Sequence, residues 1–242
     1  MSIKYSFIGC AIRSQLYLEF CNNMPKFKSS YEIIFAGQEP PIEKMPSNFK
    51  YIVTKAHPAW ATEIAARHAV GEYLIVIADD LAVSKGYLDR LDYYTNKMCM
   101  EKSLIGGRFR YANHEHCNDT ALTIDDKIVT APVFPFGIAY KRDLWNELGG
   151  VDDRFIGSYY DLDMAMRFYE RGYTPFIMPD AHSLENRKTY IPSYLWKKTG
   201  EKAREVLNEC WVKDGKYSLK RLSPVRSISD EYIKKSIEKI IG

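Results

Sequence analysis

The chain has 242 residues, of which 46% are hydrophobic and 27% charged, so we expect a compact globular protein with one large domain or a domain and an appendage. No run approaches the roughly 20 apolar residues of a membrane span, and the apolar part of the N-terminus is too short for a signal peptide. The five cysteines form no CxxC pair, which argues against a disulfide framework and predicts a cytoplasmic protein.

The formal net charge of +3 is unevenly distributed along the chain. Residues 183–242 carry fourteen Lys and Arg against eight Asp and Glu, whereas residues 1–182 have an acidic excess. A basic stretch such as 194–211 can attract anionic head groups, but such a run is usually the solvated face of a helix. We favour the solvated face and keep a peripheral membrane contact as an alternative. Without a nucleic-acid motif, no nucleic-acid partner is expected.

The first half of the chain alternates apolar runs with amphipathic helical patterns. Strands are expected at 5–11, 31–37, 50–54 and 72–80, and helices at 14–24 and 57–71. Pro58 suits the first turn of the second helix, and Gly71 lies just past its end. Strands separated by helices of this length imply crossover connections, hence an α/β fold with a mostly parallel sheet. Ligands bind such sheets outside the carboxyl ends of the strands.

The second half is less regular. Helices are expected at 86–98, from Arg142 to Gly149 and at 159–171, strands at 103–111, before Arg142 and at 173–182, and a loop or hairpin at 113–128. Neither an internal repeat nor a low-complexity linker divides the chain. We therefore expect a body at residues 1–185 and a basic helical C-terminal extension at residues 186–242.

Two acidic pairs are candidates for chemistry. Asp79 and Asp80 follow the apolar strand directly, and a buried carboxylate there needs a partner, although Asp is also an ordinary turn or cap residue. Asp161 and Asp163 lie downstream in "YDLDMAMR" and would point about 200° apart on a helix, so one should face a ligand and the other should pair locally. The alternative is that both simply complement the helix dipole.

The segments "EIIFAG", "PAWATEIAARHAVGEYLIVIADD" and "LGGVDDRF" with "YDLDMAMR" and "RGY" together resemble the family 2 glycosyltransferases of the GT-A fold, over about residues 4–183. The last block is the most specific, being similar to the family's GGFDERF, EDxDLxxR and GY sequence. The resemblance implies a GT-A, or nucleotide-diphospho-sugar transferase, fold. It also implies a sugar transfer, with inversion, from a nucleotide-diphosphate donor, expected to be UDP-linked, to a hydroxyl of a glycan or other acceptor, as in polysaccharide biosynthesis.

The resemblance also implies a divalent cation, Mn or Mg. Asp79 matches the last carboxylate of the family's DxD metal motif and Asp80 follows it, whereas Ile77 replaces the first aspartate. His182 matches a late histidine that completes the metal shell or meets the diphosphate. The expected metal ligands are therefore Asp79, Asp80 and His182, and the cation would neutralise charge on the leaving phosphate.

Asp161 falls at the position of the family's catalytic base, which takes the proton of the acceptor hydroxyl, and Tyr160 replaces the glutamate before it. On the same resemblance, the donor pocket is expected to be formed by Cys10, Ala11, Gly37, Arg67, Asp79 and Asp80. Contacts with the acceptor are expected from Phe136, Gly137 and Tyr160.

Two other functions remain open. Ile77 and Tyr160 stand where the family has carboxylates, so the chain could be a catalytically inactive module that binds a sugar nucleotide or a glycan. A nucleotidyltransferase on a similar sheet would share the metal chemistry but would consume a nucleoside triphosphate and release pyrophosphate.

Overall fold

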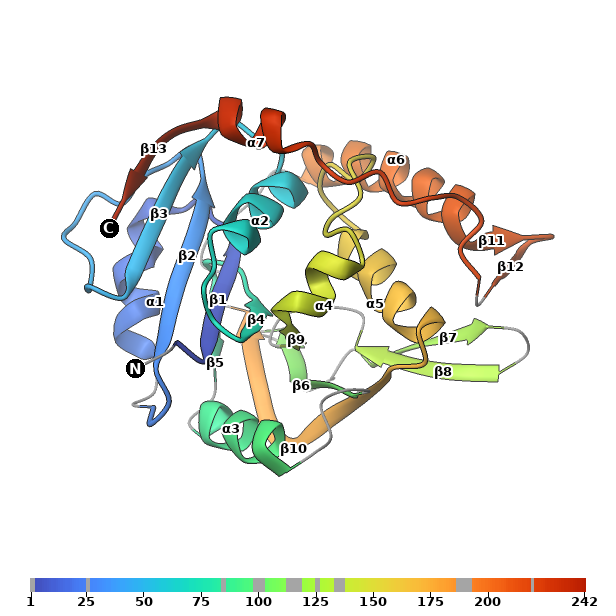
Figure 1. Ribbon diagram of the computed structural model, residues 1–242, viewed down its shortest axis with the longest axis horizontal. Coiled ribbons are helices and arrows are strands. Elements are labelled where there is room, and N and C mark those ends of the chain that lie inside the picture. The colour runs from blue at the N-terminus through green and yellow to red at the C-terminus, as the bar shows by residue number, and fades with distance from the viewer. Residues whose placement is uncertain are drawn as a thin grey trace.

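The computed structural model describes residues 3–24, 27–83, 86–97, 103–111, 119–124, 127–132, 138–185, 193–218 and 220–242. Figure 1 shows a large twisted sheet with helices on both faces and a smaller sheet at one end. None of the described helices is long and apolar enough to cross a membrane.

Within these residues, nine strands form the large sheet in the order β13-β3-β2-β1-β4-β9-β6-β10-β5. The strands are β1 (Tyr5–Cys10), β2 (Tyr31–Gly37), β3 (Phe49–Thr54), β4 (Tyr73–Val76), β5 (Leu81–Val83), β6 (Ser103–Tyr111), β9 (Ala139–Lys141), β10 (Thr174–Glu185) and β13 (Ile237–Ile241). The run β3-β2-β1-β4 and the pair β6-β10 are parallel, whereas β5, β9 and β13 pair antiparallel with their neighbours. The predicted mixed, mostly parallel sheet is confirmed.

Both faces of this sheet are buried, which explains the continuous apolar runs in the sequence. Successive side chains alternate between two cores: Phe7 joins one and Ile8 the other, and Ile33 and Ile34 divide in the same way. One core packs against α1 (Tyr17–Asn23), which follows the short 3-10 helix η1 (Ser14–Leu16), and against α3 (Tyr87–Lys97). The other packs against α2 (Pro58–Arg67), α4 (Arg142–Glu147), α5 (Tyr160–Glu170), α6 (Ser193–Trp211) and α7 (Asp230–Ser236).

Local signals in the sequence correctly placed several helix ends. Pro58 occupies the first turn of α2, where its missing N–H costs nothing. Gly149 and Gly150, after α4, have φ values of 85° and 65°. A Cβ at Gly150 would lie 2.3 Å from Oε1 of Glu63, so this turn also requires a residue without a side chain.

The smaller sheet has the order β11-β12-β7-β8. Its strands are β7 (Asp119–Ile124), β8 (Lys127–Pro132), β11 (Val212–Lys213) and β12 (Lys216–Tyr217). The hairpin β7-β8 lies where a loop or hairpin was expected, at 113–128, although it extends four residues further along the chain. It is joined to the C-terminal part of the chain through β12, which pairs with β7.

The C-terminal segment contains more than the expected helices. After α6 the chain forms β11 and β12, and it ends in β13, which lies alongside β3 at the edge of the large sheet (Figure 1). Trp211, at the end of α6, is fully buried in the same core as α5. The described part of residues 186–242 is thus packed into the body of the protein at both ends.

Candidate functional site

The ends of β1 and β4 meet at the carboxyl edge of the sheet, and Asp79 joins them. The N–H of Ile77 donates to the carbonyl of Ile8 at 2.8 Å, which continues the β1-β4 pairing beyond β4. Two residues later, Oδ2 of Asp79 accepts the N–H groups of Ile12 and Arg13, both at 2.8 Å. Asp79 is only 3% exposed, so its carboxylate faces the β1 loop and fixes its shape.

Arg13 completes this cluster. Its guanidinium donates to Oδ1 of Asp79, and its other terminal nitrogen lies 3.1 Å from Oδ2 of Asp80. Burial raises the pKa of Asp79 above its ordinary value, although Arg13 and the two N–H groups act in the opposite direction. Nothing in the spacing of the sequence singled out Arg13 as a partner of the acidic pair.

This geometry does not fit the expected role of Asp79 as a metal ligand. Each of its oxygens already accepts an N–H donor, and a guanidinium cation lies where a divalent cation would need to bind. In the described part of the chain, no three His, Cys, Asp or Glu side chains converge in a way that could hold a metal ion. His182 pairs through its backbone with Arg108 between β10 and β6, but its side chain lies outside the described structure.

Three other residues of the expected donor pocket lie at the same edge. Ala11 and Gly37 follow and end two neighbouring parallel strands, and a Cβ at Gly37 would lie 2.1 Å from the carbonyl oxygen of Ala11. That oxygen accepts the hydroxyl of Tyr51 at 3.0 Å. Burial, together with the charge of Asp79, raises the pKa of the Cys10 thiol to about 12, so Cys10 lines the edge as a neutral group.

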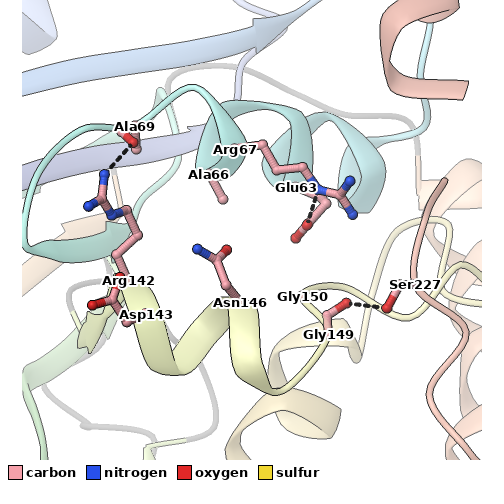
Figure 2. Close-up of a pocket in the computed structure, with 10 residues that line it drawn as sticks. All are labelled: Glu63, Ala66, Arg67, Ala69, Arg142, Asp143, Asn146, Gly149, Gly150 and Ser227. Atoms are coloured by element: carbon pink, nitrogen blue, oxygen red, sulfur yellow. Dashed lines mark hydrogen bonds and ion pairs between the residues drawn. The ribbon is translucent and has the colours of Figure 1, made fainter. Parts of the chain in front are cut away.

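Arg67 lies elsewhere. It ends α2, and its guanidinium donates to Oε1 of Glu63 at 2.8 Å, to the carbonyl of Ile228 at 2.7 Å and to Asp230. Figure 2 shows it lining a polar pocket of about 460 Å³ between α2 and α4, opposite Arg142. The backbone N–H of Arg142 donates to the carbonyl of Glu72, which directly precedes β4, whereas Asp79 follows β4. Arg67 is therefore at the opposite edge of the sheet from Asp79.

Asp161 lies in the first turn of α5 and is half-buried. Burial raises the pKa of its carboxyl to about 7, the charge of Asp163 adds to this, and the N–H groups of Asp161 and Leu162 oppose it. Among the residues that the structure describes, no Lys, Arg or His forms an ion pair with Asp161. A carboxyl that titrates near neutrality is suited to accept a proton.

Tyr160 links Asp161 to the carboxyl edge of β1. Burial, together with the charges of Asp161 and Cys10, raises the pKa of the Tyr160 hydroxyl, and Thr62 of α2 acts in the opposite direction. Cys10 in turn is influenced by Asp79. Electrostatic interactions thus connect Asp79 with Cys10, Cys10 with Tyr160 and Tyr160 with Asp161. Phe136 and Gly137 lie outside the described residues.

Asp163 has a different environment from Asp161, as their spacing predicted. It is fully buried, and Oδ1 accepts the indole N–H of Trp211 at 2.8 Å. Oδ2 lies 2.9 Å from Nη2 of Arg167, and Arg221 approaches Oδ1 at 3.1 Å. The local pairing expected for one member of the Asp161/Asp163 pair is therefore made by Asp163.

Comparison with known proteins gives a structural match only. No protein-family model and no curated protein matches the chain. The structure is similar to S. aureus TarS 1–349 in complex with UDP, with a TM-score of 0.59 and 13% identity over 85% of this chain and 66% of that one. The complex of the same fragment with UDP-GlcNAc gives a TM-score of 0.58 at 14% identity, covering 85% and 67%.

The fold is that of the GT-A glycosyltransferases. A longer TarS chain matches with a TM-score of 0.58 and 14% identity, and there the match covers 85% of this chain but only 40% of TarS. At such low sequence identity the structural match establishes the fold alone, and the reaction has to be argued from the site.

Proposed function

We propose that this protein is an inverting glycosyltransferase of the family 2 type, which moves a sugar from a nucleotide-diphosphate donor to a hydroxyl group of a glycan or glycoconjugate. UDP is the favoured nucleotide, because two of the similar TarS structures are complexes with UDP and UDP-GlcNAc. The observation that carries the proposal is Asp161, a half-buried carboxyl in the first turn of α5 whose pKa of about 7 suits a general base, and whose neighbour Tyr160 interacts electrostatically with Cys10 at the end of β1.

On the acceptor side, Asp161 takes the proton of the attacking hydroxyl, while the oxygen of that hydroxyl forms a bond to the anomeric carbon. The bond from that carbon to the nucleotide diphosphate breaks, and its electron pair leaves on the phosphate oxygen. Attack and departure on opposite faces invert the anomeric centre. General-base assistance of this kind contributes typically ~10²–10⁴-fold to the rate.

On the donor side, the cluster of Arg13, Asp79 and Asp80 shapes the edge where the diphosphate binds in this proposal. Asp79 holds the β1 loop through the N–H groups of Ile12 and Arg13. The planar guanidinium of Arg13 has five donors, and those not used by the two carboxylates suit phosphate oxygens. Two carboxylates already balance the charge of Arg13, so in this proposal Arg13 orients the diphosphate and does not supply net positive charge. The proposed steps are those of the protein side chains alone.

A thermal-shift comparison of UDP, GDP, dTDP and CMP tests the donor class. A ligand that binds the native state at a hundredfold excess over its Kd stabilises it by about 2.7 kcal/mol. We expect UDP and UDP-GlcNAc to raise the Tm more than the other nucleotides. Equal or absent shifts with all four would contradict a UDP-linked donor.

An inactive sugar-nucleotide-binding module is the second candidate, favoured by one observation. Ile77, at the position of the first family carboxylate, is 1% exposed and belongs to the core, so it offers no ligand atom. Under this alternative, UDP-GlcNAc would stabilise the protein, yet no UDP would be released from it with any acceptor or with water.

A further inference from the structure

Tyr159, two residues before Asp161, has an unusual backbone conformation. Its φ of 64° and ψ of −4° are left-handed. A residue with a bulky side chain rarely adopts this region, because its Cβ is then too close to the neighbouring backbone. Among the described non-glycine residues only Asp214, in a tight turn before Gly215, shares a positive φ. Strain of this kind persists only where surrounding contacts enforce it.

The contacts that hold Tyr159 come from α6, in the C-terminal extension. Arg204 donates from Nη2 to the Tyr159 hydroxyl at 3.0 Å, and its guanidinium carbon lies 5.9 Å from the centre of the Tyr159 ring. A Cβ at Gly157 would lie 3.8 Å from Thr199, so the loop before Tyr159 also runs close to α6. α6 itself is anchored by Trp211, whose indole donates to Asp163 of α5.

The conformation of Tyr159 determines how α5 begins. Its carbonyl oxygen accepts the N–H of Asp163 at 3.0 Å, and its side chain provides no cap for the helix. Asp161 lies between these two residues in the first turn of α5, where the N–H groups of Asp161 and Leu162 act to lower the pKa of its carboxyl. If Tyr159 relaxed to a common backbone conformation, the chain entering α5 would change direction, and Asp161 would move with it.

We propose that Arg204 and Tyr159 act as a positioning clamp through which helix α6 fixes the orientation of Asp161, so that the C-terminal extension takes part in glycosyl transfer. The inference rests on the proposed function for its catalytic consequence, but the placement of Asp161 can be measured without any substrate. Tyr159→Phe removes only the hydroxyl, and Arg204→Gln replaces the guanidinium at an exposed position by a shorter, neutral amide.

The first test is the titration of the Asp161 carboxyl, followed by NMR in the substrate-free protein. Asp163, Tyr140 and Tyr160 are the titratable groups that influence or are influenced by Asp161, and neither substitution changes them. We expect both variants to admit water to Asp161 and to lower its pKa from about 7 towards the ordinary value of a carboxyl. Lys202→Gln, which removes a positive charge from an exposed position of the same helix, should leave this pKa unchanged.

The second test is the release of UDP from UDP-GlcNAc with water as acceptor. We expect kcat to fall about tenfold in each variant with little change in KM, and the double variant to be no worse than either single one, because both substitutions break the same contact. An unchanged Asp161 titration in both variants would overturn the clamp. If the titration moves but the wild-type protein releases no UDP, the clamp stands and the proposed glycosyltransferase function fails.

Discussion

Arg13 and Asp79 form a nearly buried ion pair at the carboxyl edge of the sheet, and the backbone N–H of the same arginine donates to the same carboxylate at 2.8 Å. The side chain of Asp79 is 1% exposed and that of Arg13 11%. The carboxylate that the family resemblance assigns to a metal is therefore built into the protein as a structural partner of the β1 loop.

This pairing predicts that Asp79 stabilises the protein in the absence of any ligand. Asp79→Ala would leave a nearly buried guanidinium and two backbone N–H groups without their acceptor, so we expect a loss of about 3 kcal/mol in the free energy of unfolding. Urea denaturation in EDTA measures it, with Asp89→Ala on the exposed face of α3 as the control. If the ligand-free Asp79→Ala variant were as stable as the wild type or more stable, Asp79 would instead be a ligand-binding residue that does not stabilise the fold.

Arg67, which the sequence places in the donor pocket, and Arg13, which the structure places there, should respond differently to substitution. Arg13→Ala should remove most of the Tm increase caused by UDP, whereas Arg67→Ala should leave that increase unchanged, because Arg67 lies at the opposite edge of the sheet and binds Glu63 and Asp230. Both variants are compared at their own starting Tm. A loss of the UDP response in Arg67→Ala would show that this edge, as the sequence suggested, does reach the nucleotide.

Asp152 joins the C-terminal segment to the body and gives a pH-dependent prediction. It is fully buried and accepts from Arg154 at 2.8 Å and from Arg221 at 2.7 Å, and these bonds hold its pKa well below the usual value. Because the folded-state pKa is depressed, this stabilisation is fully present above the unfolded value of about 3.9 and is lost gradually as the pH falls from there to the much lower folded value.

Asp152→Asn should therefore destabilise the protein by roughly 3–5 kcal/mol at pH 7 and by much less near pH 2. The measurement is the free energy of unfolding in urea across that pH range. If the difference between variant and wild type were the same at both pH values, the ionised form of Asp152 would not be the source of the stabilisation.

The ionised form of Asp161 is expected to affect the free energy of unfolding in the opposite direction to that of Asp152. Its pKa is raised to about 7 on folding, so the ionised carboxylate costs stability above the unfolded value of about 4, and the cost is complete once the pH exceeds the folded value. Asp161→Asn should make the substrate-free protein more stable than wild type by about 1–2 kcal/mol at pH 8, a figure reduced for the partial exposure of the side chain, and equally stable near pH 4. Unfolding curves at the two pH values test this. A variant that is less stable at pH 8 would mean that Asp161 serves the fold.

The sequence predicts the regular elements well because each depends on local chemistry. The apolar runs at β1, β2 and β4, Pro58 at the start of α2 and the glycine pair after α4 all have signals within a few residues. β13 has no such signal, since "IEKII" becomes a strand only because the exposed edge of β3 is available to pair with it.

The site is less predictable, because side-chain partners come from distant parts of the chain. Arg13 and Asp79 are 66 residues apart, and nothing in either motif states that they pair. Arg67 matched a family position, yet α2 runs back across the sheet, so that its last turn lies at the edge away from Asp79. The strained backbone of Tyr159 depends on Arg204, 45 residues later, and is invisible in the sequence.

The most direct test of the account is Asp161→Asn, assayed for UDP release from UDP-GlcNAc together with the thermal shift caused by the same compound. The asparagine keeps the size of the side chain but cannot take the proton, so we predict at least a ~100-fold loss of rate with an unchanged Tm increase. A variant that binds UDP-GlcNAc normally and turns it over at the wild-type rate would contradict the assignment of Asp161 as the base.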